Sequence, residues 1–385
     1  MNILHVTPYY LPAYPFGGVV RAVEGMSAAL IRRGHQVTVL TTDAVSRTER
    51  YSGELVETID GVRVIRVRNW IPALRRSNLS TPIGMRRIAP SLIADADVIH
   101  LHEFRTAEAL IVTPAAERRH KPVVMSPHGT LTLDAGETGL KRIWDRVLSP
   151  PVSRRINAVI GLTEKETAEA RELWTQFGTS SHFYTIPNGV NAAEFDSLNG
   201  AEAFRQQYGI GGAPLILFMG RLHRRKGASL LVKAFLQAAI PGAKLMIAGP
   251  DEGELAVITP MLTPDVIVPG FLDAAARRAA LAAADVFVLP ALGGEGLPMA
   301  VLEALAAGVP VMISPACGLP IVERSQAGVI TAAEPDAIAA ALRDLVADPS
   351  RRALMRDNAR RLARDQFSWD TVGAQLEAVY QEVTR

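Results

Sequence analysis

A glycine-rich basic loop in the second half of the chain is the strongest candidate for chemistry. The apolar run Leu215–Met219 passes into Gly220–Gly227, with the sequence GRLHRRKG, just before a helical stretch. Cations between glycines at such a junction suit a diphosphate: Arg221 can donate to two oxygens, and Lys226 supplies a point charge. Each charge-assisted hydrogen bond would contribute about 1.5–3 kcal/mol. We therefore expect Arg221 and Lys226 to contact a ligand, whereas the other basic side chains of the loop fit a solvated turn.

Two glutamates near a later helix start could bind the rest of such a ligand. They lie in the segment GGEGLPMAVLEALAAGVPV, which follows the apolar run Val286–Leu289. Pro298 is placed like the first residue of a helix, with Leu297 near its cap. Glu295 is then expected in the loop and Glu303 in the second helical turn. This order fits a nucleoside diphosphate sugar, with phosphates at the helix start and carboxylates on the ribose and the hexose. Taken singly, each glutamate has a simpler interpretation as a surface or loop residue.

Further candidates lie after predicted strands in the first half. Gly17 and Gly18 precede a helix and allow close approach of the backbone to an anion, although a turn without a ligand explains them equally well. His128, in the run Ser-Pro-His-Gly, follows one strand, and the run His-Leu-His-Glu that contains His102 and Glu103 ends another. His102 or Glu103 could face a second substrate. A metal site there is disfavoured because no third ligand has convincing spacing.

Short apolar runs alternate with helix-period segments along the whole chain, which predicts parallel α/β sheets. The rhythm restarts after Gly211-Gly212, so we expect two α/β domains with ligands at the carboxyl ends of their strands. The predicted strands are Ile3–Thr7, Val37–Thr41, Val62–Val67, Val98–Leu101, Val123–Ser126, Ala158–Leu162, Phe183–Ile186, Leu215–Met219, Lys244–Ala248, Val266–Val268, Val286–Leu289 and Val309–Ile313. The predicted helices include Val20–Arg33, Glu164–Trp174, Ser229–Gln237, Ala274–Ala284 and Met299–Ala307.

Bulk composition excludes several other classes of protein. The chain has 385 residues, a length that suits two cores, and a net charge of only +2, which does not favour a nucleic-acid partner. Cys317 is the single cysteine, so no internal disulfide can form. The first residues lack a basic leader, and no apolar run is long enough to span a bilayer. The expected location is the cytoplasm.

Together, these motifs resemble glycosyltransferase family 4, a large retaining family with the GT-B fold. The resemblance rests on Gly220–Gly227 followed by Glu295-Gly-Leu-Pro, four residues and Glu303, and it extends to the early Gly-Gly loop and the tail Phe367-Ser368-Trp369. It implies an α/β GT-B fold, with two Rossmann-like domains facing across a cleft. Residues 1–195 would form the acceptor domain, with a C-terminal helix of about 368–385 packing back on it. Residues 196–367 would bind the donor.

The resemblance also implies roles for the candidate residues. Arg221 and Lys226 would hold the diphosphate, Glu303 the ribose and Glu295 the donor sugar. His128 would lie by the transferred sugar. We therefore predict His128, Glu295, Arg221 and Lys226 as the catalytic set. Gly17, Gly18, Gly296, Leu297 and Glu303 would complete the donor site, and His102 or Glu103 would lie on the acceptor side.

The implied reaction moves a sugar from a UDP- or GDP-sugar to an acceptor hydroxyl with retention, as in assembly of cell-surface polysaccharide or glycolipid. No cofactor or metal is expected. Asp95-Ala96-Asp97 has the spacing of metal-binding carboxylates, but it precedes a strand rather than following one. The alternatives are a sugar-phosphate synthase, phosphorylase or epimerase on the same fold, or a non-catalytic nucleotide-sugar-binding protein. A dehydrogenase is disfavoured because no G-x-G-x-x-G follows the first strand.

The acceptor side carries one further hypothesis. Trp70, Ile71 and Leu74 mix with the pairs Arg75-Arg76 and Arg86-Arg87 in the segment 70–93. Such a segment could rest on an anionic membrane surface, on the inner face of the plasma membrane, and reach a lipid-linked sugar. A solvated basic segment explains the same residues.

Overall fold

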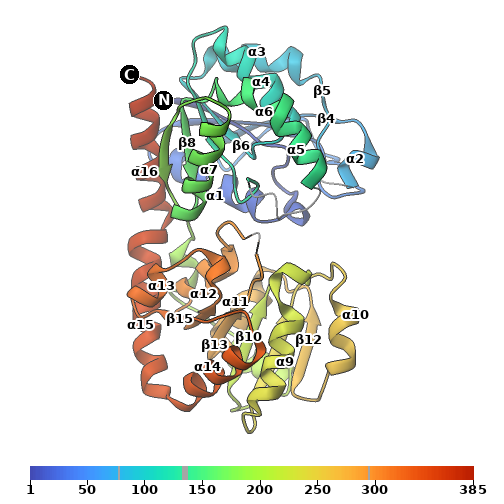
Figure 1. Cartoon of the computed structure of the whole chain (residues 1–385), viewed down its shortest axis with the longest axis vertical. Helices are drawn as coiled ribbons and strands as arrows, with labels where there is room; N and C mark the ends of the chain where they lie inside the picture. Colours follow the sequence, from blue (N-terminus) through green and yellow to red (C-terminus); the bar gives the residue numbers. More distant parts are fainter. Residues whose placement is uncertain (77–78, 132–137, 294) are drawn as a thin grey trace. The chain divides into compact units, whose positions relative to one another are not determined.

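The computed structural model describes residues 1–76, 79–131, 138–293 and 295–385 (Figure 1). This described chain divides into two compact units. Met1–Gly189 and Trp369–Arg385 form the first, and Val190–Ser368 forms the second. Each unit is an α/β structure built on a mostly or wholly parallel sheet. Among the described residues, none of the helices is both long and apolar enough to cross a membrane.

The sheet of the first unit has the strand order β3-β4-β2-β1-β6-β7-β8-β9, and β5 pairs with β4. All pairs are parallel except those of β3 and β5 with β4. The strands are β1 (Asn2–Val6), β2 (Gln36–Thr42), β3 (Val56–Ile59), β4 (Val62–Asn69), β5 (Pro82–Ile83), β6 (Val98–His102), β7 (Val123–Ser126), β8 (Ala158–Gly161) and β9 (His182–Thr185). The helices are α1 (Gly18–Arg32), α2 (Pro72–Arg76), α3 (Met85–Asp95), α4 (Ala107–Glu117), α5 (Thr138–Val147), α6 (Ser149–Ser153), α7 (Glu164–Gln176) and α16 (Trp369–Val383). Apolar clusters cover both faces of this sheet, which is why its central strands are nearly continuous hydrophobic runs.

The sheet of the second unit is entirely parallel, in the order β12-β11-β10-β13-β14-β15. Its strands are β10 (Leu215–Met219), β11 (Lys244–Ala248), β12 (Val266–Gly270), β13 (Val286–Leu289), β14 (Val311–Ile313) and β15 (Gly328–Ile330). The helices are α8 (Ala201–Gln207), α9 (Ala228–Ala238), α10 (Leu255–Ile258), α11 (Ala274–Ala283), α12 (Met299–Ala306), α13 (Ile321–Arg324), α14 (Pro335–Ala347) and α15 (Pro349–Phe367). Three of the strands, β3, β5 and β15, lack a matching sequence prediction. They are short or sit at the sheet edge, where the hydrophobic signal is weak.

The predicted return of the C-terminal helix to the first domain is confirmed. Helix α15 ends at Phe367, because the backbone of Ser368 is extended. Helix α16 then packs against α1 in the first unit. The Trp369 ring fills a space that only glycines leave open, because a Cβ on Gly25 or Gly189 would lie 2.1 or 2.4 Å from it. Arg33 forms an ion pair with Glu377 beside this contact. The tail is therefore part of the first core, with α16 shown in red beside it in Figure 1.

Candidate active site

The two glycine-containing loops of the second unit meet at the point where its strand order reverses. Strands β10 and β13 are neighbours there, and each ends in one of these loops. Leu292 N–H donates to the Arg225 carbonyl over 2.8 Å, which ties the loops together. Gly227, with φ of 75°, lies so close to Pro290 that a Cβ would come within 2.2 Å of the proline carbonyl oxygen. Such a switch point is the usual ligand site of an open α/β sheet.

The structure brings Lys226 and Glu295 together at this switch point. Lys226 Nζ lies 2.6 Å from Glu295 Oε2, and the two side chains are only 19% and 8% exposed. Lysine has three donors, so one ammonium can hold this carboxylate and still donate to a ligand oxygen. Cys317 is buried beside the pair. Its burial, reinforced by the charge of Glu295, raises the pKa of its thiol to about 12, so the thiol stays protonated.

Arg221 is held by Glu252, a carboxylate that no sequence motif marked. Its Nη1 lies 2.9 and 3.1 Å from the two oxygens of Glu252, in the loop after β11. Gly249 at the end of β11 packs against Gly220, where a Cβ would come within 1.8 Å of the Gly220 carbonyl oxygen. The Arg221 side chain remains 37% exposed. Glu252 thus orients the Arg221 guanidinium, and part of the guanidinium stays accessible to a ligand. The rule that functional residues follow strands could have found Glu252.

Glu303 is buried and paired rather than displayed on the surface. Its Oε1 lies 3.2 Å from Arg277 Nη1, with side chains 8% and 17% exposed. Arg277 lies inside α11, where no sequence signal marked it. Helix α12 begins at Met299, where the predicted helical segment begins, but Pro298 is its N-cap rather than its first helical residue. A proline cannot cap a helix with its side chain. The first backbone amides of α12 point out of the helix start, toward the loop that carries Gly296 and the buried Leu297.

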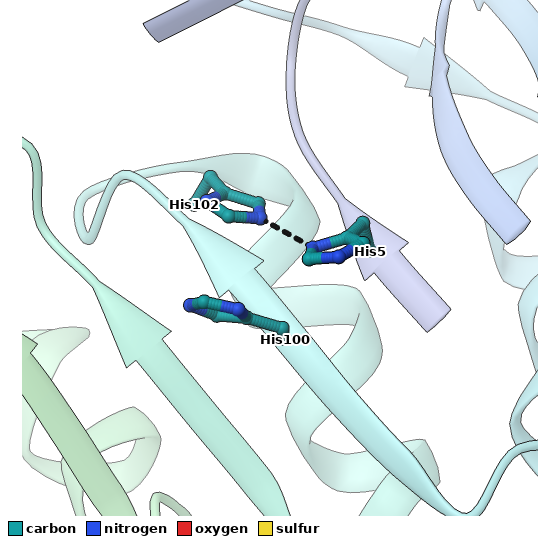
Figure 2. A group of neighbouring side chains, drawn as sticks. All are labelled: His5, His100 and His102. Atoms are coloured by element: carbon teal, nitrogen blue, oxygen red, sulfur yellow. Dashed lines mark hydrogen bonds between the residues drawn. The ribbon is translucent and has the colours of Figure 1, made fainter. Parts of the chain in front are cut away.

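In the first unit, the predicted residues also gather at a strand-order reversal, between β1 and β6. His102 lies at the end of β6, and His128 follows β7 in a left-handed conformation with φ of 56°. His102 Nδ1 lies 2.9 Å from His128 Nε2, and its Nε2 lies 2.8 Å from His5 Nδ1. His5, on β1, was not singled out by the sequence. Figure 2 shows it pointing toward His102 beside His100.

The early glycines lie at the start of α1, as predicted, although the helix begins at Gly18 rather than Val20. Gly17 is the N-cap residue, with φ of 114°. A Cβ at this position would meet nothing within 4 Å, so its conformation, and not crowding, is what favours glycine.

Comparison with known proteins assigns the chain to a family. The model of "Glycosyl transferases group 1" matches residues 200–362, and that of "Glycosyltransferase Family 4" matches residues 16–194. A GDP-mannose-dependent monoacylated α-(1-6)-phosphatidylinositol monomannoside mannosyltransferase of Corynebacterium glutamicum is 31% identical over 72% of this chain and 74% of its own. The chain belongs to glycosyltransferase family 4, in group 1. The fold and family expected from the sequence are thereby confirmed.

Two further proteins resemble this glycosyltransferase, one in sequence and one in fold. Glycogen synthase of Mycobacterium tuberculosis is 28% identical over all of this chain and 95% of its own. The structure of Anabaena HepE in complex with UDP-glucose superposes with a TM-score of 0.77, at 20% identity, over 99% of this chain and all of that one. The shared architecture is the GT-B fold.

Near the histidines, the predicted Glu103 of this glycosyltransferase lies in a group of polar residues with Glu108 and Tyr9, which the sequence did not reveal. Burial, together with the charge of Glu108, raises the pKa of Glu103 to about 7. Burial likewise raises the pKa of Glu108, on α4, to about 7, although Ser80 Oγ donates to it over 2.7 Å. The Tyr9 hydroxyl is buried beside both glutamates, and its burial, together with their charges, raises its pKa.

The raised pKa of Glu108 predicts a pH-dependent stability. Folded Glu108 keeps its proton from its ordinary pKa of 4.5 up to about 7, whereas the unfolded carboxyl loses it. The free energy of unfolding therefore falls as pH rises through this window, by about 3 kcal/mol at most. Glu108→Gln removes this loss, so its melting temperature should rise relative to wild type between pH 5 and pH 8.

A control for this experiment removes the hydrogen bond to the same carboxyl. Ser80→Ala takes away the donor that favours the charged form of Glu108. It should retain the fall in stability with pH and steepen it. Equal pH profiles for Glu108→Gln and wild type would contradict a raised pKa.

Proposed function

We propose that the protein transfers a sugar from a UDP- or GDP-sugar to an acceptor hydroxyl, with retention at the anomeric carbon. The observation that carries this proposal is the Lys226–Glu295 pair at the switch point of the second sheet. A diphosphate placed there would meet Lys226, the accessible part of Arg221 and the first amides of α12. These groups supply positive charge where the leaving diphosphate develops its negative charge.

The carboxylates would then orient the sugar and the ribose. Glu295 is held by Lys226 at the phosphate end, so we assign it to hydroxyls of the transferred sugar. Glu303, on the first turns of α12, is held by Arg277, and we assign Glu303 to the ribose hydroxyls. In neither role does a carboxylate act as a covalent nucleophile. We propose attack on the same face as the departing diphosphate, whose own oxygen accepts the acceptor proton, without a metal ion.

Of the residues in the first unit, we place His128 by the transferred sugar and Glu103 by the acceptor. Both ring nitrogens of His102 are hydrogen-bonded to other histidines, so His102 has no nitrogen left to contact a substrate. We therefore propose that it acts by positioning His128. The relatives support a sugar or lipid-linked sugar as acceptor: one is named for a phosphatidylinositol monomannoside and another for glycogen. A role in cell-surface polysaccharide or glycolipid assembly in the cytoplasm is consistent with both.

A screen of donors tests the proposal. Thermal melting is measured with UDP, GDP, ADP and their common sugar conjugates, with and without divalent metal. A ligand at 100 times its Kd stabilises a fold by about 2.7 kcal/mol, enough to raise the melting temperature visibly. A metal-independent rise with one nucleotide, followed by product analysis, would identify the donor. The absence of any rise would contradict a nucleotide-sugar donor. A sugar phosphate as the preferred acceptor would favour the synthase alternative.

We also propose that the first unit contacts an anionic membrane on the inner face of the plasma membrane. Trp70 is 59% exposed, and Ile71 and Leu74 beside it are also exposed. Exposed Arg86 and Arg87 follow on α3, and a hydrogen bond from Trp70 N–H to the Thr81 carbonyl ties the two segments together. Arg75 takes no part in this surface, because its side chain turns inward and donates to the carbonyls of Arg47 and Thr48.

Co-sedimentation with anionic vesicles checks the membrane proposal. Wild type should bind in a salt-sensitive way, and Trp70→Ser with Arg86→Ala and Arg87→Ala should bind several-fold less. Neutral vesicles are the control for charge. Equal binding of wild type and the triple variant would contradict the proposed surface.

A further inference from the structure

Three histidines from three different strands or strand ends form one continuous hydrogen-bonded chain. His5 Nδ1 lies 2.8 Å from His102 Nε2, and His102 Nδ1 lies 2.9 Å from His128 Nε2. The two free ends are His5 Nε2 and His128 Nδ1. Both are buried and have no hydrogen-bond partner among the described residues. We call His5, His102 and His128 the histidine chain. Its first link is the dashed line in Figure 2.

Burial keeps this chain uncharged. Burial, and to a lesser degree the proximity of His128, lowers the pKa of His5 to about 3. Burial alone lowers that of His128 to about 4. Burial, and to a lesser degree the rings around it, lowers the pKa of His102 well below its usual value. At neutral pH each ring therefore carries one hydrogen, on one of its two nitrogens.

Neutral rings in such a chain cannot choose their tautomers independently. Each link needs one N–H and one lone pair. If His128 carries its hydrogen on Nδ1, its Nε2 must accept from His102 Nδ1–H, and His102 Nε2 must accept from His5 Nδ1–H. The opposite choice places the hydrogen on Nε2 of all three rings. A mixed state would leave two hydrogens or two lone pairs facing each other in a buried link, which is unfavourable.

We propose that His5 and His102 are positioning residues that set, through this shared tautomer, whether His128 Nδ1 donates or accepts a hydrogen bond. The proposal rests on the proposed function, in which His128 adjoins the transferred sugar. A shared Nδ1–H tautomer would donate to a sugar or phosphate oxygen, and a shared Nε2–H tautomer would accept from a sugar hydroxyl. The residue that contacts the sugar is thus controlled from His5, on another strand.

The backbone around His128 holds its ring in place for this task. Gly129 N–H donates to the Glu166 carboxylate, which also accepts from Leu162 N–H over 2.7 Å. These bonds fix the left-handed turn at His128. The backbone position of His128 is thereby set, and the hydrogen bond to His102 orients its ring.

A metal site is the competing explanation of this cluster. Ring nitrogens of His5, His100 and His102 all lie within 4.8 Å of one another. However, the His5–His102 nitrogens are 2.8 Å apart, closer than the separation of about 3.3 Å expected for two ligands at 2.0–2.1 Å in a tetrahedral zinc site. Both nitrogens of His100 are already bonded, to Tyr380 OH at 2.6 Å and Ser126 Oγ at 2.8 Å. The geometry is that of a hydrogen-bonded chain.

The decisive experiment reads the tautomers directly. The chain has 8 histidines, few enough for ¹⁵N-histidine labelling and NMR, with assignment by single substitutions. The proposal expects His5, His102 and His128 to be neutral and to share one tautomer in the wild-type protein. Any change on addition of the donor should occur in all three together. Mixed tautomers would overturn the proposal, as would a stoichiometric metal ion in the purified protein.

Variants of His5 add a functional readout. His5→Phe fills the volume but removes the partner of His102, and kcat should fall about tenfold, the effect of one hydrogen bond of ordinary strength. His5→Gln can still donate or accept, so it should recover most of this loss. Tyr380→Phe is the matched control, because it removes a buried hydrogen bond to His100 but leaves the chain intact. Equal losses in His5→Gln and His5→Phe would overturn the proposal.

These outcomes are distinct from a failure of the proposed function. The NMR measurement on wild type needs neither turnover nor a variant. If no donor binds but the three tautomers match, the coupling stands and the proposed reaction fails. If transfer is observed but the tautomers are mixed, the reaction stands and the inference about His5 and His102 fails.

Discussion

Lys226→Met should lower kcat/KM for sugar transfer by about 100-fold or more and abolish stabilisation by nucleotide diphosphates. The Lys226 side chain is only 19% exposed, and its ammonium lies 2.6 Å from Glu295 at the switch point. Methionine keeps the length of the side chain and removes the charge. Loss of one preorganised group that stabilises developing charge typically lowers the rate 10²–10³-fold. Steady-state kinetics with the donor identified by thermal melting checks the prediction.

The same substitution should also destabilise the second unit. It leaves the Glu295 carboxylate, only 8% exposed, without its cation, at a cost of up to about 3 kcal/mol. Loss of activity in Lys226→Met could therefore come from destabilisation instead of from the missing charge. A double variant separates these two explanations. Lys226→Met with Glu295→Gln has no unpaired charge and should regain most of the melting temperature but none of the activity. Recovery of transfer in the double variant would show that the pair is structural only and would contradict the proposed donor site.

Gly227→Ala should lower both the stability of the second unit and the rate of sugar transfer. Its φ of 75° is strained for alanine, and the added Cβ would come within 2.2 Å of the Pro290 carbonyl oxygen. Strain and overpacking together should lower the free energy of unfolding by about 2–5 kcal/mol. The loops that carry Lys226 and Glu295 would have to separate, and a shift of about 1 Å in such groups can cost 100-fold in rate. Thermal melting and kcat/KM of the variant measure the two effects.

Gly242→Ala separates backbone strain from this close contact. Gly242 has nearly the same φ, 71°, but a Cβ there would meet nothing within 4 Å. Its variant should lose only about 1–2 kcal/mol, the usual cost of a left-handed residue, and should keep full activity. If Gly227→Ala and Gly242→Ala proved equally stable and equally active, the close approach of the two loops would not matter for the site.

The locations of the main elements follow largely from local sequence. Strand β10 is found as predicted, because five consecutive apolar residues between polar turns fit a strand buried on both faces. The break between α15 and α16 is also found at the predicted Ser368. Predictions at element ends were less accurate: β14 begins at Val311 instead of Val309, because Pro310 lacks the N–H needed to extend the sheet pairing.

By itself, the sequence determined the family, the alternation of strands and helices, and the loop and helix segments in which Arg221, Lys226, Glu295 and Glu303 lie. These features depend on residues near one another in the chain. The sequence could not show which charges pair, because that depends on strand order and register. Lys226 reaches Glu295, 69 residues away, only because β10 lies beside β13.

The histidine chain depends on tertiary structure in the same way. His5 meets His102, 97 residues away, because β1 and β6 are parallel neighbours in a register that sets His5 opposite His100. A shift of one residue in that register would turn His5 to the other face of the sheet, since side chains alternate along a strand. Local sequence therefore supplies the chemical groups, and the packing of distant strands decides which of them act together.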